Sequence, residues 1–270
     1  RPRVVADFRD RLRDAGRGVV LTRKVLGTLS AMLEYGVNER EVIAFNPAKG
    51  VRVHGRRDEG AKKITPPTKD QVRALIEAAD ADLAEALRFA AATGVRAGEL
   101  WALRWRNVDL EAGVVSVVGR VDAYGEVGPP KSAAGVRAIP LSAAMVQALK
   151  AWRLRSRFST LDDLVFPNRK GAFTNHSNVL DRGWRAACEG AGLGDYVVKR
   201  PGGRQFKPSI NFHALRHFAV SCWIEAGLQP KTLQTLAGHS SITITLDRYG
   251  HLLPNEGPRE AMDRIADVLF

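Results

Sequence analysis

The sequence predicts a mainly α-helical protein with a small antiparallel β-sheet, in the α+β class, and it divides the chain into two domains. Most segments of the 270 residues carry apolar side chains three and four positions apart, which is the period of an amphipathic helix. Two β-branched segments near the middle flank a turn region containing Gly and Pro, which indicates strands. A charged stretch with glycines and adjacent prolines interrupts both periods, and we interpret it as an interdomain linker.

The first domain is predicted to span residues 1–50 and to contain a helix over residues 19–36. Apolar residues recur at helical spacing across this segment, and Gly36 is suited to end it as a C-cap. Residues 51–68 follow as the linker, because their charges, glycines and paired prolines fit neither a helix nor a strand.

The second domain, residues 69–257, begins with two predicted helices. The first follows Thr68, a residue type that caps helix N-termini, and the second ends at Gly94. The β-branched segments GVVSVVGRV and GVRAIPL come next, and they predict a small antiparallel sheet that carries Lys131 near a loop.

The remainder of the chain is predicted to be helical. The expected helices cover residues 142–157, 175–190, 211–226, 230–237, 241–249 and 258–268. The last of them lies in a C-terminal tail, residues 258–270, and such a short amphipathic helix needs a surface to cover.

The composition favours a polyanionic partner. The chain has 41 Lys and Arg against 29 Asp and Glu, a net charge of +12 and a pI near 10.1. Nucleic acid is therefore the leading candidate, and a merely soluble basic surface is the alternative. The two cysteines lack the spacing of a zinc site or a disulfide framework, and no apolar run is long enough to span a membrane. We expect a cytoplasmic protein without a metal, a cofactor or a membrane partner.

In the predicted helix 211–226, His213, Arg216 and His217 share a stripe beside the apolar face, because positions i, i+3 and i+4 lie on one side of a helix. These three side chains can meet one ligand. Two histidines at i and i+4 also bind zinc in metalloproteases, but there a Glu follows the first His and here Ala214 does. A solvated polar helix face is the structural alternative.

The segment ATGVRAGEL is predicted to end one helix and start the next, which places Arg96 in a tight corner near helix-end amides that suit an anion. Glu99 is spaced to hold the Arg96 guanidinium by a charge-assisted hydrogen bond, and an exposed ion pair of little consequence is the alternative. Lys131 follows two prolines at a turn that can present its ammonium group to a ligand, although most hairpin lysines are only solvated.

The segment GHSSITITLDRYGHL supplies His239 and Tyr249. A phenol is a poor nucleophile at neutral pH, so its attack on phosphorus needs cations at the phosphate and a proton acceptor nearby. The basic residues named above can provide both. The alternative for Tyr249 is an amphipathic core residue whose hydroxyl is tied to a partner.

Together these segments make the chain resemble the tyrosine recombinases, the phage integrases and their relatives. The motifs TGVRAGEL, PKSAAGVRAIPL, HALRH and LAGHSSITITLDRYGHL occur in the order of that family, and FNPAKG is similar to the usual end of its core-binding domain. The resemblance implies the tyrosine-recombinase catalytic fold over residues 69–257, preceded by a partial helical core-binding domain. The first domain is short for that role, so we expect further helices upstream of it.

The resemblance also implies how the phosphate is held. Arg96 and Arg216 would clamp the non-bridging oxygens of the scissile phosphate, and His239 would hydrogen-bond to it. Glu99 would support Arg96 from behind without touching the phosphate. Two guanidiniums and one ammonium can neutralise the charge that develops on phosphoryl oxygens without a metal ion.

The implied chemistry is DNA strand cleavage and rejoining. Tyr249 would attack the phosphate, Lys131 would act as the acid toward the leaving oxygen, and His213 would aid proton transfer at the tyrosine. The product would be a 3′-phosphotyrosyl link and a free 5′-hydroxyl, and a homo-tetramer on DNA would exchange strands through a Holliday junction. The tail helix would dock onto a neighbouring protomer, as it does in the family.

Integration of a mobile element is the first choice among the activities that the resemblance allows. Chromosome-dimer resolution, plasmid resolution and transposition would use the same residues. The resemblance also leaves open a type IB topoisomerase-like enzyme, which relaxes DNA without exchange, and a DNA-binding protein that has lost catalysis.

Basic residues outside the six reactive positions are candidate DNA contacts. The segment VVKRPGGRQFKP is predicted to be a loop that follows the DNA backbone, with a solvated insertion as the alternative. The candidates are Arg137, Lys199, Arg200, Arg204 and Lys207. The expected partners are double-stranded recombination sites and accessory DNA-bending or directionality proteins. The expected location is the nucleoid within the cytoplasm, and the expected origin is bacterial or phage.

Overall fold

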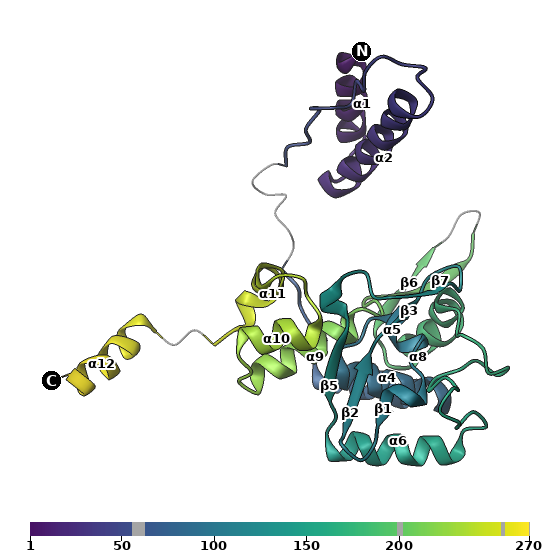
Figure 1. Ribbon diagram of the computed structural model, residues 1–270, viewed down its shortest axis with the longest axis vertical. Coiled ribbons are helices and arrows are strands. Elements are labelled where there is room, and N and C mark those ends of the chain that lie inside the picture. The colour runs from purple at the N-terminus through teal and green to yellow at the C-terminus, as the bar shows by residue number, and fades with distance from the viewer. Residues whose placement is uncertain (56–62, 199–201, 255–256, 270) are drawn as a thin grey trace. The chain divides into compact units, whose positions relative to one another are not determined.

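The computed structural model describes residues 1–55, 63–198, 202–254 and 257–269 (Figure 1). The chain separates into two compact units, Arg1–Lys62 and Lys63–Phe270. Helices dominate both, and the described strands form small antiparallel sheets in the second unit, which confirms the predicted class. Within the described ranges, no helix combines the length and apolar character that crossing a membrane requires.

The first unit packs two helices, α1 (Pro2–Asp14) and α2 (Val19–Asn38), around a small apolar core. Helix α1 was not predicted, because its charged residues outnumber its apolar ones, although Pro2 stands at the helix start where Pro is favoured. Helix α2 continues past Gly36, where we expected it to end. Gly36 has an ordinary helical conformation next to the side chain of Ile43, and a Cβ there would make only van der Waals contact, so the glycine does not end the helix.

The predicted linker, residues 51–68, is partly absorbed by the two units. Val53 is buried in the core of the first unit, whereas Ile64 packs against an apolar cluster of the second. Thr68 is the N-cap of α3, as expected. Residues 56–62 lie outside the described residues.

The second unit begins with α3 (Lys69–Ala78) and α4 (Ala81–Thr93). Thr68 forms a capping box with Gln71, which satisfies two amides at the start of α3. Gly94 ends α4 in the left-handed conformation with φ of 61°. Both boundaries agree with the sequence prediction, because caps are encoded by single residues.

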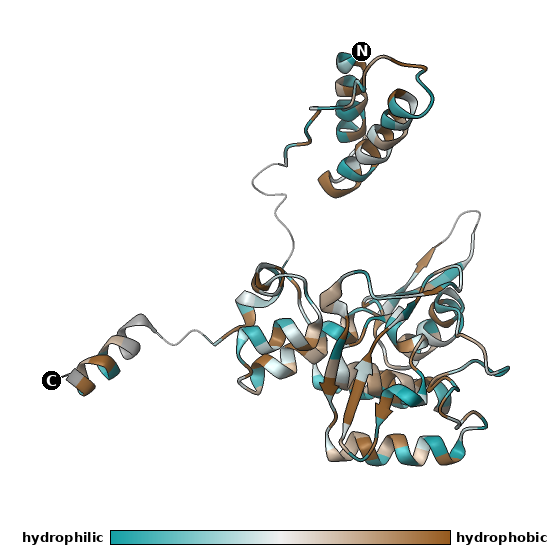
Figure 2. Ribbon diagram, viewed as in Figure 1, coloured by the Kyte–Doolittle hydropathy of each residue, from teal (hydrophilic) through white to brown (hydrophobic). Residues whose placement is uncertain are grey.

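A three-stranded antiparallel sheet has the order β1 (Val108–Asp109), β2 (Val114–Val117) and β5 (Arg137–Pro140). Figure 2 shows these strands largely hydrophobic. The segment predicted as one strand, GVVSVVGRV, is divided, because β3 (Arg120–Val121) leaves this sheet and pairs with β4 (Val127–Gly128). Lys131 follows β4 at the turn into the short three-ten helix η3 (Ala133–Gly135).

Helical structure then alternates with one further hairpin. Helix α6 spans Ala143–Arg155, and the predicted helix 175–190 is found as three consecutive pieces, α7 (His176–Asn178), the π-helical η4 (Val179–Trp184) and α8 (Arg185–Gly190). The segment that we interpreted as a loop, residues 197–208, overlaps an antiparallel pair of strands, β6 (Gly194–Val198) with β7 (Arg204–Pro208). Glycines and lysines in this segment hide the alternation of apolar and polar residues that is typical of a strand. Among the described residues of the two strands, Phe206 is the one buried against the core.

The C-terminal part of the chain folds as α9 (Ala214–Glu225), α10 (Pro230–Ala237), α11 (Ile242–Tyr249), η5 (Gly250–Leu252) and α12 (Pro258–Leu269). Helices α9, α10 and α11 lie together (Figure 1). Helix α9 belongs to two apolar clusters, because Leu215 joins the main core and Val220 joins a second cluster that includes Tyr249. Helix α9 therefore connects the main core with the second apolar cluster.

The short helix α5 (Ala97–Trp101) starts directly after Gly94 and Arg96, where the sequence predicted a new helix. Leu100 and Trp101 anchor it in the main core, together with Leu75, Leu87 and Phe89 from α3 and α4. The corner between α4 and α5 is therefore rigidly placed, and it carries Arg96.

Candidate active site

Three consecutive carbonyl oxygens at the C-terminal end of α10 each accept a hydrogen bond from a different arginine. The pairs are Arg137 Nε with Leu236 at 2.8 Å, Arg216 Nη2 with Ala237, and Arg96 Nη2 with Gly238 at 3.0 Å. Carbonyls in the last turn of a helix lack intrahelical partners and carry the negative end of the helix dipole. The end of α10 therefore gathers cations from three distant segments into one place.

Two glycines in the left-handed conformation make this arrangement possible. Gly94 ends α4, and its carbonyl accepts a hydrogen bond from Arg216 Nη1 at 2.7 Å. Gly238 ends α10 with φ of 63°, and a Cβ there would lie 2.9 Å from the carbonyl oxygen of Ala134. Both the backbone conformation and the close packing thus require glycine at position 238.

Glu99 is buried between two of the arginines. Its carboxylate accepts hydrogen bonds from Arg96 Nη1 at 2.8 Å and from Arg137 Nη2 at 2.8 Å, and it also caps the backbone N–H of Arg96. Burial acts to raise the pKa of Glu99, but the hydrogen bonds and charge of Arg137, followed by the hydrogen bonds from Arg96, hold that pKa below its usual range. Glu99 therefore stays ionised and orients Arg96, as the sequence spacing predicted.

Arg137 differs from its expected role as a DNA contact. Its side chain is only 2% exposed, and its donors are directed to Glu99, Leu236 and the carbonyl of Gly135. A guanidinium enclosed in this way cannot reach a DNA backbone. Position 137 lies on β5 with its side chain toward the core, so Arg137 holds Glu99 and the end of α10 in place.

Arg216 is buried at the centre of the cluster. Burial, followed by repulsion from Arg96 and Arg137, lowers its pKa to about 9, so it remains cationic at neutral pH. Within the part of the chain that the structure describes, Glu99 is the only carboxylate bonded to this cluster, and it bonds to Arg96 and Arg137, whereas Arg216 bonds only to the carbonyls of Gly94 and Ala237. The site therefore holds an excess of positive charge, and an anion entering it would be strongly stabilised.

His239 follows Gly238 and is also buried. Its Nδ1 lies 2.9 Å from Thr245 Oγ1, while its Nε2 has no hydrogen-bond partner among the described residues. Burial, followed by the charges of Arg216 and Arg96, lowers its pKa to about 3, so the ring is neutral. A Thr245 hydroxyl that donates to Nδ1 leaves the proton on Nε2, where it can be donated to an anion. Sequence reasoning missed Thr245, because nothing local marks its hydroxyl as the partner of a histidine.

Tyr249 is the last residue of α11 and is buried, with 1% of its surface exposed. Its ring stacks on that of His239, with centroids 6.3 Å apart. Burial raises the pKa of the Tyr249 phenol, against the opposing charges of Arg216, Arg248 and Arg96. The phenol is therefore protonated at neutral pH, and it needs a proton acceptor before it can act as a nucleophile.

The histidine bonded to Tyr249 is His217, whereas the family resemblance implied that His213 aids proton transfer at the tyrosine. His217 Nδ1 lies 2.7 Å from Tyr249 Oη. The His213 ring stands perpendicular to that of His217, with centroids 4.8 Å apart. Burial is the first cause that lowers the pKa of each of these two histidines to about 4, so both are neutral at pH 7.

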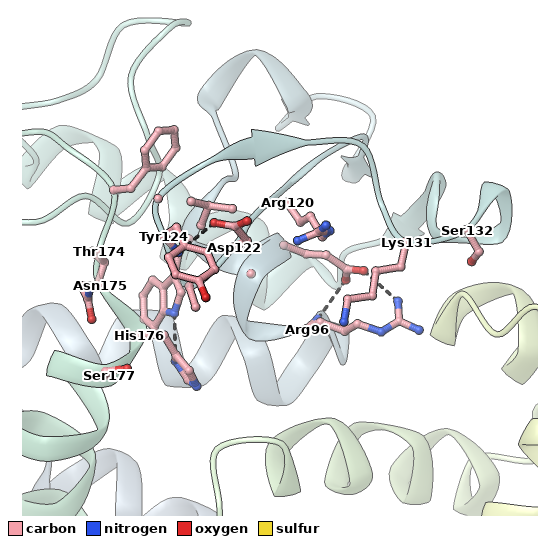
Figure 3. A pocket seen from close by; sticks show the side chains of 17 residues that line it. Arg96, Arg120, Asp122, Tyr124, Lys131, Ser132, Thr174, Asn175, His176 and Ser177 are labelled. Atoms are coloured by element: carbon pink, nitrogen blue, oxygen red, sulfur yellow. Dashed lines mark hydrogen bonds and ion pairs between the residues drawn. The ribbon is translucent and has the colours of Figure 1, made fainter. Parts of the chain in front are cut away.

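Lys131 lines a cavity of about 530 Å³ together with Arg96 (Figure 3). Figure 3 shows its side chain extending from the turn after β4 toward Arg96. A close contact shapes this wall, since a Cβ on Gly98 would lie 2.5 Å from the carbonyl oxygen of Val121, and a second packs the turn that carries Lys131, since a Cβ on Gly135 would lie 2.4 Å from Pro130. The cavity therefore places the exposed side chain of Lys131 on the same wall region as the partly exposed guanidinium of Arg96.

The remaining candidate DNA contacts fall between positions 199 and 207 of the sequence. Arg204 and Lys207 are exposed on β7, and the Arg204 guanidinium lies over the ring of Tyr196, 5.0 Å from its centroid. Lys199 and Arg200 lie outside the described residues. No three His, Cys, Asp or Glu side chains gather as metal ligands in the described ranges.

Comparison with known proteins places this site in a family. The family model described as "Phage integrase family" matches residues 67–256, which include the arginine cluster, Lys131, the histidines and Tyr249. The chain belongs to the phage integrase family. It is thus a tyrosine recombinase by family, as the resemblance predicted.

Individual phage integrase relatives have low sequence identity to this chain, but they align with most of its length. The chain is 28% identical to the prophage integrase IntR of Escherichia coli over 87% of its own length and 58% of that relative. It is 25% identical to the ICEBs1 integrase of Bacillus subtilis over 99% of its own length and 71% of that relative. The chain therefore spans little more than half of IntR.

Solved integrase structures show the same fold. The Tn1549 transposon integrase in complex with circular intermediate DNA superposes with a TM-score of 0.68 at 18% identity, over 98% of this chain and 84% of that one. A lambda integrase tetramer bound to a Holliday junction gives a TM-score of 0.61 at 20% identity, over 90% of this chain and 65% of that one. The predicted catalytic fold is confirmed by these likenesses.

Proposed function

We propose that this protein is a site-specific DNA recombinase that cleaves and rejoins strands through a tyrosine–phosphate intermediate. The observation that carries the proposal is the buried Tyr249 phenol, bonded to a neutral histidine and set beside a cluster of cations with a single carboxylate among the described residues. Membership of the phage integrase family and the likeness to a prophage integrase and to the ICEBs1 integrase support it.

In this proposal the scissile phosphate occupies the positive site. Arg96 and Arg216 bind its non-bridging oxygens with the N–H groups that Glu99 and the carbonyls of Gly94, Ala237 and Gly238 leave free. The unpartnered Nε2 of His239 donates the further hydrogen bond. These donors are held before substrate arrives, so they stabilise the charge of the transition state without reorganising.

The bonds then exchange at phosphorus. Tyr249 Oη forms a bond to phosphorus, the phenolic proton leaves to a base, and the bond from phosphorus to the 5′-oxygen breaks. Lys131 gives a proton to that oxygen, from the cavity that it shares with Arg96. The phosphodiester energy stays in the 3′-phosphotyrosyl link, so the 5′-hydroxyl of another strand can reseal the break by the reverse steps.

The partners in this proposal are double-stranded DNA sites and three further copies of the chain. Exchange through a Holliday junction in a tetramer follows the arrangement named for lambda integrase. The reaction takes place on DNA in the cytoplasm, with accessory DNA-bending or directionality proteins where the element supplies them. The prophage integrase and the transposase of transposon Tn916 among its relatives favour a mobile element as the substrate.

The test is trapping of the covalent intermediate. Duplexes from the junctions that flank the gene, nicked so that the cleaved end diffuses away, are incubated with protein and run on a denaturing gel. We expect an adduct with the wild type and none with Tyr249→Phe. Adduct formation by the phenylalanine variant would refute Tyr249 as the nucleophile. Relaxation of supercoils without recombinants would indicate a topoisomerase instead.

A further inference from the structure

We propose that His217 is the residue that accepts the phenolic proton of Tyr249 during strand cleavage and returns it during rejoining. This inference rests on the recombinase chemistry proposed above, and it assigns the base at the tyrosine. The distance of 2.7 Å between His217 Nδ1 and Tyr249 Oη is the contact that carries it. The expected histidine, His213, lies one helical turn earlier, at the N-cap of α9, and its ring packs on the ring of His217.

The direction of the hydrogen bond follows from the state of the two groups. The His217 ring is neutral because burial, followed by the charges of Arg248 and Arg216, lowers its pKa to about 4. The phenol is protonated because burial raises its pKa. An imidazole nitrogen is a far better acceptor than a phenol oxygen, so Tyr249 donates to Nδ1 and the ring proton of His217 sits on Nε2. The acceptor is therefore already aligned with the proton that must leave.

The charges around the pair explain how transfer becomes favourable when DNA is bound. Arg216 on α9 and Arg248 on α11 face His217, and Arg96 adds its charge at Tyr249. In the free protein these cations oppose an imidazolium at position 217. A phosphate bound by Arg96 and Arg216 brings negative charge to the same place and offsets them. Proton transfer is thus coupled to the presence of substrate.

The proton and electron pairs balance in this step. The Oη–H bond breaks, its electron pair forms the bond from Oη to phosphorus, and the proton moves to His217 Nδ1. The bond from phosphorus to the 5′-oxygen breaks, and Lys131 protonates that oxygen. In rejoining, the 5′-hydroxyl attacks, and His217 returns its proton to the phenolate of Tyr249.

A purely structural role for His217 would be to satisfy a buried hydroxyl. Tyr249 lies in the cluster of Val220 and Leu233, where an unpaired phenol would be costly. The variants must therefore separate hydrogen bonding from proton transfer. His217→Asn places an amide oxygen near the position of Nδ1 and can accept a hydrogen bond, but it cannot take a proton. Ser221→Ala, one turn further along α9, controls for general disturbance of the helix.

The experiment measures single-turnover adduct formation on the nicked duplex between pH 6 and 10. We expect His217→Asn to be about 100- to 10,000-fold slower than wild type at pH 7, which is the range for loss of a general base. The deficit should shrink as pH rises, because hydroxide ionises the phenol directly. It should also shrink when Tyr249 is replaced by a fluorinated tyrosine of lower pKa. Ser221→Ala should match the wild type at every pH.

Two kinetic outcomes would overturn the assignment. Cleavage by His217→Asn at the wild-type rate, or a deficit that stayed constant across pH and phenol acidity, would leave His217 a purely structural partner. Nitrogen-15 NMR of the DNA-free protein gives an independent reading, since Nδ1 must be the unprotonated nitrogen and must shift in Tyr249→Phe. If the wild type formed no adduct at all, the proposed function would fail, whereas the NMR result would still decide the pairing.

Discussion

At the scale of single residues, the site depends on charged side chains that are buried and held in place by hydrogen bonds to one another. Arg137 and Glu99 form a buried pair with side chains 2% and 3% exposed, and Arg96 binds the same carboxylate. Residue spacing predicted the pair of Arg96 and Glu99, because both lie in one helical turn. It did not predict Arg137 as the second partner, because Arg137 comes from β5, and only packing of that strand against α5 and α10 brings it inward.

This pair predicts a pH-dependent stability. Glu99 has a pKa below its ordinary value of 4.5, so its ionised form contributes stability that is fully present above that value and is lost as pH falls through the lower, folded pKa. We expect Glu99→Gln to be less stable than wild type at pH 7 by about 3–5 kcal/mol, as for a broken buried ion pair. Urea denaturation of both proteins at pH 7, and at a series of pH values below 4.5, measures this difference in the free energy of unfolding.

The measurements below pH 4.5 are compared with a control variant. The gap between wild type and Glu99→Gln should narrow below pH 4.5, whereas Glu77→Gln, which removes a carboxylate at a position on α3 outside the arginine cluster, should leave the wild-type profile unchanged. A gap that stayed constant from pH 7 to pH 3 would show that ionised Glu99 contributes nothing to folding.

At the scale of elements, the end of α10 organises the site. Its last carbonyls bind three arginines that come from β5, from α9 and from the corner between α4 and α5. The sequence indicated this helix and a glycine to end it, since PKTLQTLAG combines Pro at the start with Gly at the end. The sequence contained no sign that the carbonyls at the end of this helix would accept hydrogen bonds from arginines, because three other segments of the chain must converge there.

A substitution at Gly238 tests this role. Alanine would be strained by the left-handed backbone, at about 1–2 kcal/mol, and its Cβ would also overlap the carbonyl of Ala134. Gly227→Ala is the matched control, because Gly227 has φ of 81° and open space around it. We expect Gly238→Ala to lose at least about 1–3 kcal/mol more than the control in thermal or urea unfolding, because of the overlap, and to slow adduct formation. Equal losses in the two variants would show that the overlap with Ala134 costs nothing.

At the scale of the whole molecule, the chain is a basic protein whose cluster of buried cations is local to the second unit. In the proposed recombinase, the net charge of +12 attracts DNA over a broad surface, and the cluster around Arg216 binds the scissile phosphate. The tail helix α12 adds a further surface, because the apolar side chains of Met262, Ile265 and Val268 are exposed in the single chain. Such a helix is suited to dock onto another copy.

Deletion of residues 258–270 tests whether the tail joins protomers. In the proposed tetramer, we expect the truncated protein to cleave a single site at a rate within about threefold of the full chain, because the deletion removes no residue of the arginine cluster. It should fail to form recombinant products and should sediment on DNA as a smaller complex than the full chain. Unchanged assembly and recombination would remove the docking role.

The sequence by itself determined the class of fold, the helix caps at Thr68 and Gly94, and the spacing that puts His213, Arg216 and His217 on one helix face, because each of these depends on neighbours within a few residues. Only the tertiary structure decided which histidine meets Tyr249 and that Arg137 points inward. Those two outcomes depend on where α11 ends against α9 and where β5 lies against α10. Contacts between segments far apart in the chain are set by packing of the whole core, and no local period encodes them.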